Sequence, residues 1–124
     1  EISVGELYDK ITILNIKLKK INDPNKLKNI KIELDALIEQ SNKLILKEDE
    51  ILKKNIQKLQ DINEELWDIE NAKRECEANK EFGEIFIKIS RDVHFKNDIR
   101  ASIKKEINLL SNSKITEEKE YSKY

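Results

Sequence analysis

The sequence contains one cysteine, one proline, two glycines and no methionine, and aromatic residues make up only 6% of its 124 residues. The single cysteine, Cys76, cannot form a disulfide within the chain, which favours a reducing compartment. So few glycines and prolines leave few forced breaks between elements, and no glycine-rich loop is present to cradle a phosphate. The scarcity of chain-breaking residues therefore favours long helices.

The chain also has no excess of charge of either sign: it contains 24 basic and 25 acidic residues, and its net charge is -1. This balance disfavours nucleic acid and anionic membranes as partners. No segment is typical of a signal peptide or of a membrane-spanning run of about 18 apolar residues. One cysteine and one histidine exclude a structural zinc site in practice. We therefore expect a cytoplasmic protein with no metal and no cofactor.

Charged residues make up 40% of the chain and hydrophobic residues 38%, a composition typical of long amphipathic helices with a real core. A chain of 124 residues is long enough for one such domain and too short to expect two. The predicted fold is all-α, an antiparallel helical bundle of four to five helices that starts with a helical hairpin.

The N-terminal half predicts this hairpin. Ser3 is a suitable N-cap, and apolar residues recur at 3–4 spacing from residue 4 to residue 21. Asp23 and Pro24 then form a cap followed by a proline at the first helical position, so a second helix must turn back on the first. Ile13 and Ile16 give the first helix a second apolar face. That face predicts either neighbours on both sides or burial in an oligomer.

In the C-terminal half, a third helix is predicted from Asp49 to Ala78, stopped by Asn79. A fourth helix follows, with a shift of its apolar stripe at Asn97–Asp98 that predicts a kink or short break. We expect the bundle domain to occupy residues 1–110. The polar tail, residues 111–124, then frays or docks through its tyrosines.

Arginine is rare, with only three among the 24 basic residues, all within residues 74–100. Because arginine offers a planar, five-donor fork, these positions are candidates for a site. Projecting the third and fourth helices at about 100° per residue places polar groups among their core-facing residues. The candidate ligand-binding residues are Asn63, Trp67, Glu70, Arg74, Asn97, Arg100 and Lys104.

Two interpretations of this polar cluster stay open. In the structural one, Glu70 pairs with Arg100 or Arg74, the asparagines hydrogen-bond helix ends or each other, and the cluster sets helix register. In the functional one, Arg100, Lys104 and Arg74 hold a phosphate or carboxylate. The catalytic residues are unknown, because the only histidine, His94, has no serine or cysteine nucleophile in a recognisable motif around it.

Three segments carry a resemblance: residues 2–11, residues 63–70 with the sequence Asn-Glu-Glu-Leu-Trp-Asp-Ile-Glu, and residues 97–108. The chain resembles a family of short, uncharacterised, all-helical proteins of bacteria and their phages, a domain of unknown function. The resemblance covers nearly the whole chain and implies one domain but no reaction. Where the family has Arg-x-Val-Tyr, this chain has Arg91, Asp92, Val93 and His94.

The sequence supports two hypotheses about function. The first is a non-catalytic interaction or accessory module that self-associates through the doubly apolar first helix, as a homo-oligomer or with a helical protein partner. The alternative is a small-molecule site between the third and fourth helices that binds or converts an anionic metabolite, with Glu70 as candidate acid or base.

Overall fold

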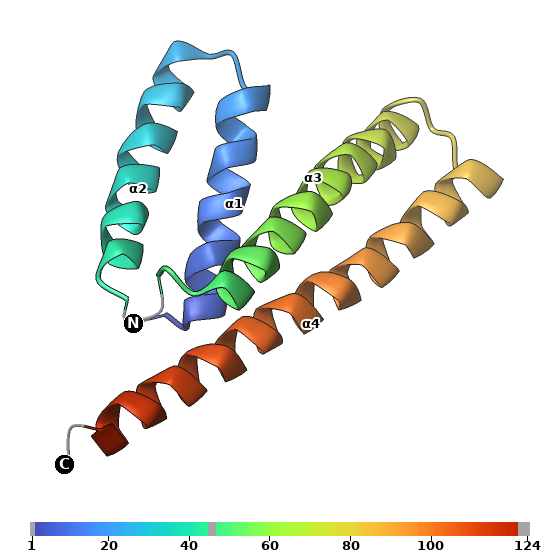
Figure 1. Ribbon diagram of the computed structural model, residues 1–124. Helices are drawn as coiled ribbons and strands as arrows, with labels where there is room; N and C mark the ends of the chain where they lie inside the picture. Colours follow the sequence, from blue (N-terminus) through green and yellow to red (C-terminus); the bar gives the residue numbers. More distant parts are fainter. Residues whose placement is uncertain (1, 45–46, 122–124) are drawn as a thin grey trace.

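Two helical hairpins make up the structure (Figure 1). The computed structural model describes residues 2–44 and 47–121, and their side chains through residue 112. The first hairpin consists of α1 (Val4–Lys20) and α2 (Pro24–Asn42), and the second of α3 (Glu50–Ala78) and α4 (Glu84–Tyr121). The described residues contain four helices and no strand, which confirms the all-α antiparallel bundle.

The central element is α1, which packs against α2, α3 and α4. The two hairpins meet near the start of α1 and splay apart towards their turns (Figure 1). The core lies where they meet and includes Leu7, Leu14, Leu52, Leu59 and Ile107. No described helix is both long and apolar enough to span a membrane.

The predicted helix ends of the first hairpin are confirmed by their caps. Ser3 caps α1, its Oγ accepting a hydrogen bond from the Glu6 amide at 3.2 Å. Asp23 caps α2, with Pro24 as its first residue, and Oδ1 of Asp23 accepts from the Asn25 amide at 2.9 Å. Such caps supply acceptors for N–H groups that have no partner within the helix.

The ends of α3 are confirmed in the same way. Its N-cap is Asp49, which accepts from the Leu52 amide at 3.0 Å, and its C-cap is Asn79. Lys80 follows in the left-handed conformation with φ of 56°. The Glu81 amide then donates to the Cys76 carbonyl at 2.8 Å, which satisfies an end carbonyl of the helix.

We expect Asp23→Ala to lower the free energy of unfolding by about 1 kcal/mol, the usual cost of losing an N-cap. Urea unfolding followed by circular dichroism measures the loss. Asn22→Ala is the matched control, because Asn22 is exposed and makes no hydrogen bond to any described residue. Equal losses in the two variants would show that the cap contributes nothing.

The predicted kink at Asn97–Asp98 is wrong, because α4 runs unbroken from Glu84 to Tyr121. The apolar stripe shifts because α4 changes partners along its length. Near its N-terminus α4 lies against α3, whereas from Arg100 onward it also contacts α1, through Asp9 and near Gly5, so a different side of α4 is buried there. Ile99, the first apolar residue after the predicted kink, is 48% exposed.

The helix also continues beyond the predicted domain end at residue 110, and Ser111 is buried. Residues 111–121 of the expected tail are therefore helical. Docking through Tyr121 and Tyr124 concerns side chains outside the described residues and stays a prediction.

The second apolar face of α1 is covered within the chain. Ile16 is 1% exposed, and Ile13 is half-buried. The sequence left two explanations for this face, neighbours on both sides of the helix or burial in an oligomer. The structure shows neighbours on both sides, since α1 lies between α2 and the second hairpin. Self-association through α1 stays a prediction.

Candidate functional site

A buried ion pair joins α1 to α4. The Asp9 carboxylate is 1% exposed, and the Arg100 guanidinium donates to both of its oxygens. Nε of Arg100 lies 2.9 Å from Oδ1 of Asp9, and Nη2 donates to Oδ2. This two-bond arrangement is the strong, directional form of an arginine–carboxylate pair, so it sets the register of α4 on α1.

Residues of α1 and α3 complete the hydrogen bonding of Asp9. Nδ2 of Asn63 donates to Oδ1 of Asp9 at 3.1 Å and to Oγ1 of Thr12 at 2.9 Å. The Thr12 hydroxyl in turn donates to the Asp9 carbonyl at 2.9 Å. Asn63 and Thr12 are both buried, and the Asp9 carboxylate, the Thr12 hydroxyl and the amide nitrogen of Asn63 all have hydrogen-bond partners inside the bundle.

Three more contacts of α4 side chains extend this network. Nη1 of Arg100 donates to Oδ1 of Asn97 at 3.3 Å. Nζ of Lys104 lies 2.6 Å from Oε2 of Glu6 and 3.6 Å from Oδ2 of Asp9. Lys104 therefore bridges two carboxylates of α1.

These surroundings change the ionisation of the central pair. Burial alone would raise the pKa of Asp9, but hydrogen bonds from Arg100 and Asn63 and the charges of Arg100 and Lys104 outweigh it and lower the pKa. The hydrogen bonds to Asp9 raise the pKa of Arg100 against the opposing effect of burial. The two groups stay ionised at neutral pH.

A pocket of about 280 Å³ lies beside this network, between α1, α3 and α4. Six of the seven candidate residues line it: Asn63, Trp67, Glu70, Arg74, Asn97 and Arg100. Ile13, Ile16 and Leu66 supply apolar wall, and Asn71 supplies a further amide. The pocket lies between the two hairpins, with Ile13 and Ile16 of α1 on one wall and residues 63–74 of α3 on another.

Three side chains of α3 face this pocket without polar partners. The side chains of Trp67, Glu70 and Arg74 make no hydrogen bond and no ion pair with any described residue. Glu70 and Arg74 lie one helical turn apart and carry opposite charges. Trp67 and Glu70 are half-buried and Arg74 is exposed.

The predicted pairing of Glu70 with Arg100 or Arg74 is wrong, because Asp9 holds Arg100 and Arg74 has no ion pair with a described residue. The prediction considered two helices only, whereas a third helix, α1, supplies the carboxylate. Lys104 lies outside the pocket lining, on Glu6 and Asp9.

The residues that the sequence analysis missed are Glu6, Asp9, Thr12 and Asn108. Oδ1 of Asn108 accepts a hydrogen bond from the Gly5 amide at 2.7 Å. It is the acceptor for an N–H group in the first turn of α1 that has no partner within that helix. One signal was available: Asp9 and Thr12 project onto the same side of α1 as Ile13 and Ile16. Polar residues on an apolar face indicate a buried network.

The remaining arginine and the histidine lie elsewhere. Arg91 and His94 are exposed on the outer side of α4, and the Arg91 guanidinium lies 5.8 Å from the centre of the Phe95 ring. The residues that line the three-helix pocket include no serine, threonine, cysteine or histidine. Glu70 is their only acidic member.

Comparison with known proteins identifies a family. The sequence model of a family of unknown function, DUF6165, matches residues 1–124, so the chain belongs to that family. This confirms the resemblance to a domain of unknown function, while its range among bacteria and phages stays a prediction. Searches of curated proteins and of solved structures found no match.

Proposed function

We propose that this member of the DUF6165 family is a non-catalytic accessory module that binds a small zwitterionic metabolite in the pocket between α1, α3 and α4. The observation that carries the proposal is the pair of opposite charges, Glu70 and Arg74, that lie on the pocket wall without partners among the described residues. Charged side chains on a partly buried surface are stabilised when a ligand supplies the opposite charges.

The charge balance of the pocket argues against a simple anion. Arg100 lines the pocket, but the Asp9 carboxylate behind it neutralises its charge. A phosphate would therefore meet one free cation, Arg74, and would be repelled by Glu70. A molecule with one carboxylate and one ammonium group, such as a free amino acid, matches both charges.

The rest of the lining suits the body of such a molecule. Trp67, Ile13 and Leu66 offer apolar contact, and Asn71 and Asn97 offer amide groups. A few polar groups in a largely apolar pocket is the usual pattern of a small-molecule site. Because the lining has no hydroxyl, thiol, amine or imidazole nucleophile and only one carboxylate, that of Glu70, the proposal is binding rather than covalent catalysis.

We expect free L-amino acids with apolar side chains, added separately at millimolar concentration, to change the fluorescence of Trp67, the only tryptophan. The N-acetyl and carboxamide derivatives, which lack the positive and the negative charge respectively, should bind about tenfold more weakly or worse, because each loses a charge-assisted hydrogen bond. Fluorescence titration with heteronuclear NMR as a second readout measures these affinities.

Two variants locate the site. Arg74→Gln should weaken binding of the free amino acid but not of its carboxamide, and Glu70→Gln should weaken binding of the free amino acid but not of its N-acetyl derivative. Lys73→Gln is the matched control, since Lys73 is next to Arg74 on α3 and does not line the pocket. A panel in which no amino acid perturbs Trp67 or its neighbours would refute the proposal.

A further inference from the structure

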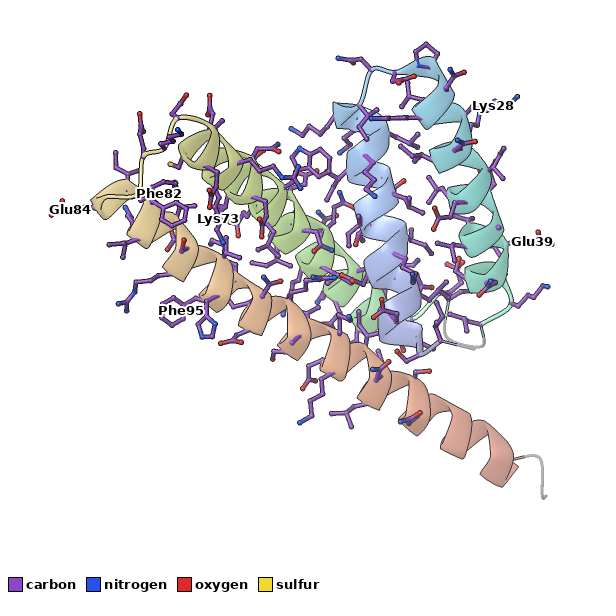
Figure 2. All side chains as sticks on the ribbon, turned by 180° about the vertical axis from the view of Figure 1, so that it is seen from behind. Lys28, Glu39, Lys73, Phe82, Glu84 and Phe95 are labelled. Atoms are coloured by element: carbon purple, nitrogen blue, oxygen red, sulfur yellow. The ribbon has the colours of Figure 1, made fainter. Side chains whose placement is uncertain are left out.

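The outer side of α4 exposes large apolar side chains. Ile87 is 56% exposed, Phe95 is 52% exposed and Ile99 is 48% exposed. Phe95 points away from the rest of the bundle (Figure 2). A shallow groove of about 430 Å³ runs between Phe86 and Phe95, lined by residues of α4 alone. Exposed apolar groups gathered on one side of a helix indicate a surface that a partner covers.

Charged residues on the same side of α4 follow a regular order. Glu84, Arg91, Asp98 and Lys105 are spaced seven residues apart, alternate in sign and are all exposed. Seven residues make nearly two helical turns, so these four side chains form one row along α4. Ile87 and His94 lie beside this row at the same seven-residue interval, and Phe95 adjoins it.

This row is complementary to itself when it is reversed. In an antiparallel copy, Arg91 lies opposite Asp98 and Glu84 lies opposite Lys105, so each charge meets its opposite. In a parallel copy at the same register, every charge meets its like. A parallel copy shifted by seven residues also matches, but it leaves unpaired ends and does not close into a dimer.

We propose that two copies of this chain pair through the outer sides of their α4 helices, antiparallel, with the two-fold axis near His94 and Phe95. The interface buries Ile87 and Phe95 of both copies. Its affinity comes mainly from these apolar groups, and the charged row selects orientation and register, because exposed ion pairs contribute little binding energy. None of the residues of this surface lines the pocket between α1, α3 and α4, so the inference is independent of the proposed ligand.

Sedimentation equilibrium of the purified chain at several concentrations tests the proposal. The wild-type chain should show a reversible monomer–dimer equilibrium. Arg91→Glu and Asp98→Arg should each weaken the dimer about tenfold or more, since each substitution replaces two attractive pairs by two repulsive ones. The double variant, Arg91→Glu with Asp98→Arg, should restore the wild-type dissociation constant.

Glu39→Arg on α2 is the matched control, because Glu39 is exposed on the opposite side of the molecule (Figure 2). It should leave the dimer unchanged, and circular dichroism should show all variants to be equally helical. A wild-type chain that is monomeric at every concentration would overturn the proposal, and a different protein would then be the candidate partner for this surface. Single variants that dimerise as tightly as the wild type, or a double variant that stays weakened, would also overturn it.

Discussion

Arg100→Ala should lower the free energy of unfolding by about 3 kcal/mol, the lower end of the cost of leaving one member of a buried ion pair alone. The truncation leaves the Asp9 carboxylate, 1% exposed, without its two-bond partner. Lys104 lies 3.6 Å from the same carboxylate and offsets part of the loss. Urea unfolding at neutral pH, followed by circular dichroism, measures the change.

Two comparisons separate this effect from general loss of packing. Arg74→Ala makes the same truncation on an exposed arginine without a described partner, and we expect it to change stability by less than about 0.5 kcal/mol. The double variant Arg100→Ala with Asp9→Asn should lose less than the sum of the two single variants, because no unpaired charge remains.

The pH dependence of this loss follows from Asp9. In the wild type the pKa of Asp9 is lowered, so its contribution to stability is present above the unfolded value of about 4 and is lost as the pH falls through the folded value. Without Arg100, burial raises that pKa, so the penalty of the buried charge disappears as the pH falls and Asp9 is protonated. The difference in free energy of unfolding between the two proteins should therefore begin to narrow above about pH 4, where Asp9 of the variant is protonated, and should keep narrowing until the pH falls below the lowered pKa of wild-type Asp9. A loss that is independent of pH would show that Arg100 acts through packing alone.

Gly5→Ala should also destabilise the chain, by about 2–3 kcal/mol, the usual cost of overpacking a close contact. A Cβ atom on Gly5 would lie 2.5 Å from the Lys104 carbonyl oxygen and 2.9 Å from Oδ1 of Asn108. The backbone oxygen cannot rotate away, so α1 and α4 would have to separate. Their separation would also lengthen the hydrogen bond between the Gly5 amide and Asn108 and the contact between Lys104 and Glu6.

Gly83→Ala is the control for adding a methyl group to a glycine where there is room for it, since Gly83 precedes α4 and no atom lies within 4 Å of a Cβ there. We expect a change of about 1 kcal/mol or less there. Thermal or urea unfolding of both variants measures the difference. If Gly5→Ala were as stable as Gly83→Ala, the close approach of α1 to α4 would not exist in solution.

Much of the helical architecture could be predicted because its determinants are local. The 3–4 spacing of apolar residues, the Asp23–Pro24 pair and Asn79 each act within a few residues of themselves. Caps and proline limit the backbone wherever they occur, whatever packs against them. The predicted boundaries of α1, α2 and α3 agree with the structure for this reason. The predictions for α4 failed at two places: the kink at Asn97–Asp98 is absent, and the helix continues past residue 110.

The candidate site could be predicted in part. The helical periodicity alone identified the candidate residues on the inner sides of α3 and α4, and six of these seven residues line one pocket. The partner of Arg100 was not visible, because the choice between Glu70 and Asp9 depends on which helix lies over the guanidinium. A carboxylate 91 residues away in sequence carries no local signal of that contact.

Local sequence patterns specify that the chain is helical, where α1, α2 and α3 begin, and which sides of them are apolar, since these properties arise from interactions within a few turns. The tertiary structure alone decided that α1 lies between the other helices, that Asp9 neutralises Arg100, and that Glu70 and Arg74 remain beside an open pocket. These outcomes depend on how two hairpins cross, and the crossing is set by packing between surfaces distant in sequence, such as the contact of Gly5 with Lys104.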